Sequence, residues 1–161
     1  MDIILKRSIE WLDRLIAFDT TSRLSNLDLI SDIEKYMKEL GVPTRLTHDK
    51  DKTKANLWCT IGPQDIGGVV LSGHTDVVPI DGQEWTKTPF RMSEESGKLF
   101  GRGTSDMKGF CAIALAMAPE MKSRDLKVPI HFAFSFDEEV GCVGVRHLIK
   151  DVVDNLPLPR E

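Results

Sequence analysis

A regular alternation of large apolar side chains with smaller or polar ones runs through Pro129-Ile130-His131-Phe132-Ala133-Phe134-Ser135-Phe136, which predicts a strand. The short apolar run Gly68-Val69-Val70-Leu71-Ser72 predicts a second strand, of the kind buried inside a sheet. Between them, the stretch from Ser105 to Met121 is rich in Ala, Met, Leu and Ile and predicts a buried helix. A strand-helix-strand crossover favours two parallel strands in an α/β sheet.

The rest of the chain predicts further layers around this unit. Apolar side chains at helical spacing predict amphipathic helices that cover the sheet, and two short β-type runs joined by the polar turn 49–52 predict a strand pair. The fold class is therefore α/β, with a mixed, largely parallel sheet flanked by helices. The expected elements are helices at 4–18, at 25–40 with a cap at Ser25 or Asn26, and at 142–152; strands at 44–47 and 56–61; and a hairpin of 90–92 with 98–100 around the turn Ser96-Gly97.

Composition limits the possible functions. A chain of 161 residues that is 41% hydrophobic accommodates one domain, or one piece of a larger one. The formal charge of -4, without a basic block, argues against a nucleic-acid partner. Three widely spaced cysteines without a CxxC pair argue against a disulfide framework and favour a reducing compartment. The longest apolar run, 111–118, is too short to span a bilayer, so we expect a soluble, cytoplasmic protein without membrane contacts.

Polar side chains that bind metals follow both predicted parallel strands. His74 lies just beyond the first strand, the pair Glu138-Glu139 lies just beyond the second, and Asp106 lies at the start of the connecting helix. In an open α/β sheet, ligands bind beyond the carboxyl ends of the strands. A short right-handed crossover returns the helix start to that same edge, so we expect the three groups to converge.

Each residue type suits a site for divalent zinc-type ions. His74 offers an imidazole nitrogen, and Asp76, two residues along an extended segment, can accept a hydrogen bond from the other ring nitrogen. Asp106 has two oxygens, which can bridge two cations spaced about 3.5–4 Å apart. Glu138 and Glu139 leave the backbone in different directions, so one can bind metal while the other takes a proton from the attacking water. The pattern predicts metal-assisted hydrolysis.

Simpler interpretations exist for each group taken alone. An HxD triplet, a Gly-rich turn or a Glu pair is most often a turn, a cap or a solvated surface, and only their joint placement favours a site. The other histidines are interpreted as a loop residue, a sheet residue and a helix-face residue, namely His48, His131 and His147. Cys142 is interpreted as a small packed thiol, because no base is set beside it.

Aromatic residues precede the Gly-rich turn. Trp85, Pro89 and Phe90 can line the mouth of a substrate site, or can pack a loop over the sheet. The sequence pattern leaves both interpretations open.

Four stretches together resemble a known family: 72–79 (Ser-Gly-His-Thr-Asp-Val-Val-Pro), 85–90, 101–110 (Gly-Arg-Gly-Thr-Ser-Asp-Met-Lys-Gly-Phe) and 137–142 (Asp-Glu-Glu-Val-Gly-Cys). They resemble the di-zinc amidohydrolases and exopeptidases, a family that includes acetylornithine deacetylase, succinyl-diaminopimelate desuccinylase, aminoacylases and carboxypeptidases. The resemblance extends over nearly the whole chain from Ile9 onward, and it implies a zinc-exopeptidase-like catalytic domain. Within the family, 106–110 and 139–142 favour the deacetylases.

The resemblance implies a role for each site residue. His74 would bind one zinc ion, Asp106 would bridge two, and Glu139 would bind the second. Glu138 would be the general base and Asp76 would orient His74. The implied cofactors are two divalent ions, with zinc first and cobalt as an alternative, and the implied backbone feature is a cis peptide between Asp106 and Met107. The implied reaction is hydrolysis of the acetyl amide of the small molecule N-acetylornithine to ornithine and acetate, in arginine synthesis.

Members of this family are longer than this chain. The resemblance implies that a carboxylate beyond the proline-rich end 156–161 completes the first zinc site and that a distant histidine completes the second. It also implies that an inserted domain makes a homodimer contact. We therefore expect 1–161 to be the amino-terminal part of a catalytic domain, incomplete at its C-terminus, with weak metal binding and little activity alone. Desuccinylase or another N-acyl-amino-acid amidohydrolase remains an alternative, as does a non-catalytic truncated remnant.

Overall fold

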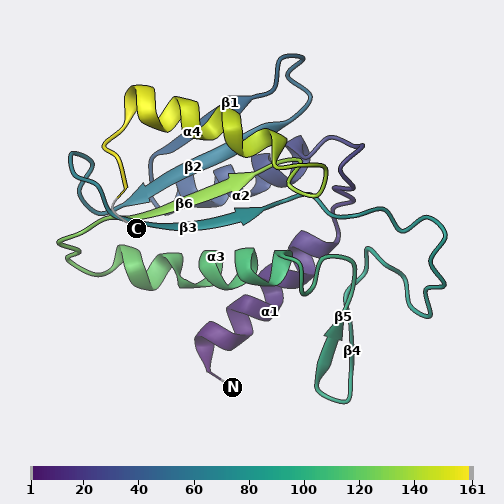
Figure 1. Cartoon of the computed structure of the whole chain (residues 1–161). Coiled ribbons are helices and arrows are strands. Elements are labelled where there is room, and N and C mark those ends of the chain that lie inside the picture. The colour runs from purple at the N-terminus through teal and green to yellow at the C-terminus, as the bar shows by residue number, and fades with distance from the viewer. Residues whose placement is uncertain (1, 160–161) are drawn as a thin grey trace.

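A four-stranded mixed sheet forms the centre of the structure, a computed structural model that describes residues 2–159 (Figure 1). The strand order is β1-β2-β6-β3, and only β3 and β6 run parallel. The predicted mixed α/β sheet is confirmed, but the sheet is less parallel than expected, because β2 pairs antiparallel with both β1 and β6. The strands are β1 (Thr44–His48), β2 (Ala55–Ile61), β3 (Val69–His74) and β6 (Ile130–Ser135).

Helices cover both faces of this sheet. In Figure 1, α4 lies on one face, and the other face is covered by α2 and by α3, against which α1 packs. All four predicted helices are present, with ends that differ by a few residues from the predictions. They are α1 (Ile3–Ile16), α2 (Leu27–Glu39), α3 (Lys108–Lys122) and α4 (Val143–Asn155).

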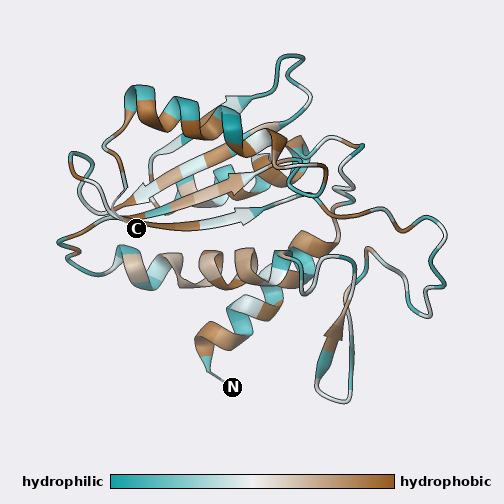
Figure 2. Cartoon of the chain, viewed as in Figure 1, coloured by the Kyte–Doolittle hydropathy of each residue, from teal (hydrophilic) through white to brown (hydrophobic). Residues whose placement is uncertain are grey.

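The core follows the alternation along the strands. On β6, Phe132 and Phe134 face the cluster formed with α1, α2 and α3, whereas Ala133 faces α4 together with Trp58 of β2. Figure 2 shows hydrophobic and hydrophilic residues alternating along α1 and α4, as amphipathic helices require. Within residues 2–159, no helix is both long enough and apolar enough to cross a membrane.

The small hairpin of β4 (Ser93–Glu95) and β5 (Lys98–Phe100) forms around the predicted turn Ser96-Gly97. Both turn residues have positive φ, 52° and 73°. A two-residue turn of this type fixes the register, so Glu95 must pair with Lys98. The first strand therefore begins three residues later than the predicted 90–92.

The helix after the Gly-rich turn begins at Lys108, three residues later than predicted. Residues 103–107 form a turn instead, closed by the Lys108 backbone N–H donating to the carbonyl oxygen of Gly103 at 2.8 Å. Gly109 permits this close packing, because a Cβ there would lie 2.4 Å from the carbonyl oxygen of Thr104. Asp106 therefore lies in the turn that precedes α3 and not inside the helix.

Candidate metal centre

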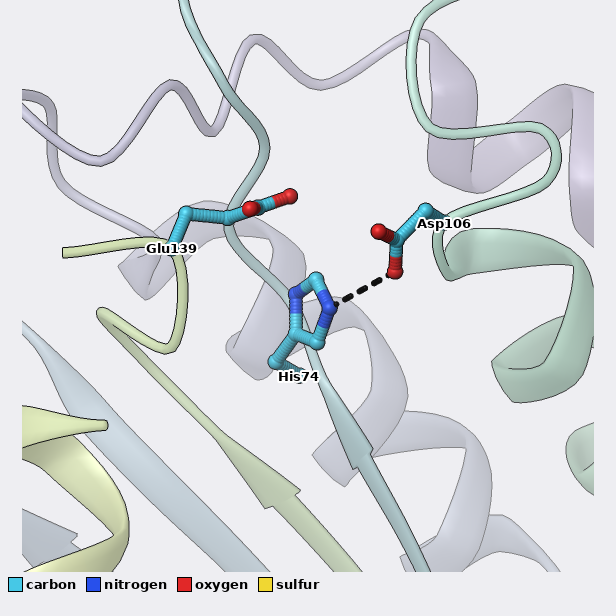
Figure 3. A group of neighbouring side chains, drawn as sticks. All are labelled: His74, Asp106 and Glu139. Carbon is cyan, nitrogen blue, oxygen red and sulfur yellow. Dashed lines mark hydrogen bonds and ion pairs between the residues drawn. The ribbon is translucent and has the colours of Figure 1, made fainter. Parts of the chain in front are cut away.

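Three separate segments bring their metal-binding side chains together at one edge of the sheet. His74 is the last residue of β3, opposite Ser135 of β6, and Glu139 lies in the turn that follows β6. Asp106 lies just before α3. One ligand atom from each of His74, Asp106 and Glu139 lies within 4.8 Å of those of the other two, and Figure 3 shows the two carboxylates flanking the imidazole. The spatial convergence predicted from the strand ends is present.

Both nitrogens of His74 are engaged in a buried setting. The side chain is 5% exposed, and Nδ1 lies 2.9 Å from the backbone carbonyl oxygen of Asp76. A carbonyl only accepts, so Nδ1 carries the proton and donates. Nε2 is then directed at Oδ1 of Asp106, 3.1 Å away. This is the orientation that a metal-binding imidazole needs, because the nitrogen facing the carboxylates can offer its lone pair.

Asp76 holds the acidic turn more closely than it holds the imidazole. Oδ1 of its carboxylate is 3.6 Å from Nδ1 of His74. The same Oδ1 accepts a hydrogen bond from the backbone N–H of Glu138 at 3.0 Å, and Oδ2 accepts one from the backbone N–H of Glu139 at 3.2 Å. The hydroxyl of Ser22 donates a third, at 2.7 Å. Sequence spacing indicated that Asp76 faces His74, but the main acceptor for the ring is the carbonyl, and the carboxylate positions the Glu pair.

Charge crowding shifts the pKa values at this edge. Burial disfavours protonated His74, but hydrogen bonds to Asp76 and Asp106 outweigh it and raise the pKa of His74 to about 9. The pKa of Glu139 is raised, first by burial and then by repulsion from Asp106. Burial also opposes ionisation of Asp76, but the nearby His74 ring, followed by the hydrogen bonds from Glu138 and Ser22, lowers the pKa of its carboxyl. A cluster that favours extra positive charge in this way fits a divalent cation, which one imidazole and carboxylate oxygens bind well.

The two adjacent glutamates occupy different positions. Glu139 belongs to the three-residue group, whereas Oε2 of Glu138 lies 3.7 Å from Nε2 of His74 on a side chain that is 43% exposed. Two neighbouring carboxylates therefore lie close to the imidazole of His74. One can serve as a ligand while the other stays free to accept a proton.

Comparison with known proteins places the chain in a family. Residues 70–159 match the family described as Peptidase family M20/M25/M40, and this match covers β6, all of β3 except its first residue, and His74, Asp76, Asp106 and the Glu pair. The chain belongs to the M20/M25/M40 peptidase family. The predicted family is thereby confirmed, and so is the cis peptide between Asp106 and Met107 that the resemblance implied.

Several enzymes are similar to this chain in sequence or in structure. The acetylornithine deacetylase of Shigella sonnei (strain Ss046) is 40% identical over 124 residues, 76% of this chain and 32% of that protein. Human carnosine dipeptidase 1 has a TM-score of 0.74 at 25% identity, over 94% of this chain and 37% of that one. The M20 metallo-carboxypeptidase Sso-CP2 of Sulfolobus solfataricus has a TM-score of 0.73 at 25% identity, over 98% and 36%. The chain thus spans about a third of the length of these relatives.

The sequence analysis did not identify the residues that hold the acidic turn 137–139 in place. Nζ of Lys54 donates to the carboxylate of Asp137 at 2.5 Å and to the carbonyl oxygen of Ser22, which ties the acidic turn to the loop after α1. Asn56 accepts a hydrogen bond from the backbone N–H of Phe136 at 3.2 Å and donates to the carbonyl oxygen of Gly144 at 2.9 Å. The sequence offered one sign of this role, a polar Asn inside a run of apolar residues that predicts a buried strand. Asn56 is fully buried, and a buried amide needs hydrogen-bond partners.

The remaining candidates lie away from the group. His48 ends strand β1, contrary to its interpretation as a loop residue, whereas His131 lies in β6 and His147 on α4 as predicted. None of the three belongs to the metal-binding group found within residues 2–159. Cys142 is exposed, so its interpretation as a packed thiol was wrong. All three cysteines are free, as expected.

Proposed function

We propose that this chain carries part of the active site of a metal-dependent amidohydrolase that converts N-acetylornithine to ornithine and acetate. The observation that supports the proposal most is the convergence of His74, Asp106 and Glu139, with Glu138 beside them. The choice of substrate is supported by the identity of 40% to the Shigella sonnei acetylornithine deacetylase. We propose two divalent ions, with zinc first and cobalt as the alternative.

Each residue has a role in the proposed reaction. His74, Asp106 and Glu139 would together hold the divalent ions. Bound divalent ions supply Lewis acidity, which lowers the pKa of water and polarises the amide carbonyl. Glu138 accepts a proton from the attacking water and delivers it to the leaving amine nitrogen. Asp76 keeps the backbone of Glu138 and Glu139 in place and fixes the His74 tautomer through its carbonyl.

The proposal assigns only part of the site to this chain. Because the chain covers 32% of the Shigella sonnei relative, we propose that further ligands and a homodimer contact lie in segments that the relative has in addition. On that basis residues 1–161 alone bind metal weakly and turn over little substrate. A reducing, cytoplasmic setting is supported by three free cysteines.

The test uses a completed enzyme. The chain is joined to the remaining carboxyl-terminal part of the Shigella sonnei deacetylase, loaded with zinc or cobalt, and compared with that intact enzyme. Acetate release from N-acetylornithine supports the proposal. Turnover of succinyl-diaminopimelate alone would replace it with the desuccinylase alternative. No turnover of either compound, while the intact enzyme is active, would favour a non-catalytic remnant.

The role of Glu138 is tested in the same completed enzyme. Glu138→Gln is expected to lower kcat by about 10²- to 10⁴-fold, the usual contribution of a general base, while the bound zinc remains unchanged. Loss of zinc in parallel with activity would show that Glu138 is a ligand instead.

A further inference from the structure

The polar segment that follows α1 is buried, at the edge of the sheet where β3 and β6 end (Figure 1). Thr20, Thr21 and Ser22 are each at most 7% exposed. Asp19 accepts hydrogen bonds from both the N–H and the hydroxyl of Thr21, which forms a turn. Buried hydroxyls are nearly always hydrogen-bonded, so the partners of Thr20 and Ser22 indicate what the segment does.

The segment runs beside the chain that follows His74. Thr21 forms a parallel β-bridge with Val77. The hydroxyl of Thr20 donates to the carbonyl oxygen of Thr75 at 2.6 Å, and the carbonyl oxygen of Thr20 accepts from the N–H of Val77 at 3.1 Å. Because Thr75 is the residue next to His74, these contacts fix the backbone that carries the imidazole.

Ser22 contacts both of the side chains that hold the acidic turn 137–139. Its hydroxyl donates to Oδ2 of Asp76 at 2.7 Å, and its carbonyl oxygen accepts from Nζ of Lys54. Asp76 in turn accepts from two N–H groups of the acidic turn, and Lys54 pairs with the carboxylate of Asp137. The position of Ser22 is therefore linked to the position of the glutamates.

The third metal-binding segment is attached to the same part of the chain through Lys108, two residues beyond Asp106. The side chain of Lys108 is buried, and its ammonium group donates to the carbonyl oxygens of Leu15 at 2.9 Å and Phe18 at 2.7 Å. A buried ammonium group costs free energy unless it is hydrogen-bonded in this way. Its backbone N–H also closes the turn 103–107. Lys108 thus fixes the turn that carries Asp106 to the end of α1.

We propose that residues 18–22 are the positioning segment of the metal centre. The segment holds Asp106 through Lys108, and it holds the other two ligands through Thr20 and Ser22. None of its residues belongs to the metal-binding group in the part of the chain that the structure describes, so it acts through the ligands. The inference rests on the proposed function only for the presence of a metal ion.

Two substitutions of Thr20 separate the role of its hydroxyl from that of its packing. Thr20→Val keeps the shape of the side chain and removes the donor to Thr75, whereas Thr20→Ser keeps the donor and removes a methyl group. In a competition titration, Thr20→Val should bind zinc about tenfold more weakly than the parent, as expected for a residue that orients metal ligands. Thr20→Ser should retain most of the affinity. A packing role would give the opposite order.

Ser22→Ala is the second variant, and Ser123→Ala is its matched control. Both replacements remove one serine hydroxyl that donates a hydrogen bond. The hydroxyl of Ser123 donates to the carbonyl oxygen of Glu120 at 2.8 Å, at the end of α3 that lies away from Asp106. Zinc affinity should fall about tenfold in Ser22→Ala and stay at the parent value in Ser123→Ala.

Hydrogen exchange followed by NMR on the metal-free chain gives a second readout, which does not depend on zinc. In Ser22→Ala, the amide protons of Glu138 and Glu139 should exchange about tenfold faster, because their acceptor has lost its support. The amide protons of Ile33 and Met37, inside α2, should exchange at about the parent rate. A role in overall stability alone would speed exchange equally at all four positions.

Three results would overturn the inference. One is an equal increase of exchange in α2 and in the acidic turn, and another is parent-like exchange of the acidic turn in Ser22→Ala. The third is parent-like zinc affinity of both Thr20→Val and Ser22→Ala. If zinc binds the parent chain too weakly to titrate, the exchange comparison decides. Failure of the proposed function is a separate outcome, because neither readout involves N-acetylornithine.

Discussion

Replacing Asp76 with Asn removes the charge that holds the acidic turn while keeping the size of the side chain. In the native chain, Oδ2 accepts from the hydroxyl of Ser22 and the N–H of Glu139, and Oδ1 accepts from the N–H of Glu138. Asn has a single acceptor oxygen, so if that oxygen keeps Glu138, the N–H of Glu139 loses its partner. The side chain of Asp76 is 3% exposed, and water therefore cannot replace the lost acceptor.

The expected cost follows from these contacts. The N–H of Glu139 loses its charged acceptor, the hydroxyl of Ser22 must accept from the new amide instead of donating, and the bond from Glu138 becomes neutral. The free energy of unfolding should therefore fall by roughly 2–4 kcal/mol. Urea unfolding followed by circular dichroism measures this change. Zinc affinity should fall about 10- to 100-fold, as for other residues that orient metal ligands, and a competition titration measures it.

Asp81→Asn is the matched control, because Asp81 is an exposed residue that pairs with Arg23 at the surface. Asp81→Asn should change neither the free energy of unfolding nor the zinc affinity. If Asp76→Asn unfolds and binds zinc like the parent, then Asp76 does not hold the Glu138-Glu139 turn and the positioning argument is wrong.

Two further predictions concern burial and pH. Lys108→Met leaves the carbonyl oxygens of Leu15 and Phe18 without their Nζ donor, at 2.9 and 2.7 Å, and should lower the free energy of urea unfolding by roughly 2–4 kcal/mol. Because the pKa of His74 is raised to about 9, its protonated form stabilises the metal-free chain fully below the unfolded pKa of about 6.5. That stabilisation is lost as the pH rises through 9, so the melting temperature relative to His74→Gln should fall across this window; a constant difference would refute it.

The sequence predicted the convergence of the metal-binding groups because convergence depends on topology. His74 and the Glu pair end two strands joined by one helix, and a right-handed crossover brings Asp106 to the same edge. Periodicity and turn residues were sufficient to find these elements. The start of α3 at Lys108 was missed, because it depends on a turn closed by one backbone hydrogen bond to Gly103.

The contacts that hold the metal-binding segments in place could not be predicted in the same way. Lys54 and Asp137 are 83 residues apart in sequence, and their contact exists only once β2 and β6 are neighbours. That antiparallel pairing was itself missed, because no short turn joins the two strands to fix their direction. Likewise, the spacing of His74 and Asp76 predicted a contact but could not decide between the carbonyl and the carboxylate.

Zinc titration of the matched variants Glu139→Gln and Glu138→Gln tests most directly whether three distant segments hold a cation at this edge. The two residues are neighbours in sequence, and only Glu139 belongs to the group within 4.8 Å. We expect Glu139→Gln to weaken zinc binding at least about tenfold and Glu138→Gln to bind zinc like the parent. Equal affinities in the two variants, or a greater loss in Glu138→Gln, would be incompatible with the proposed metal centre.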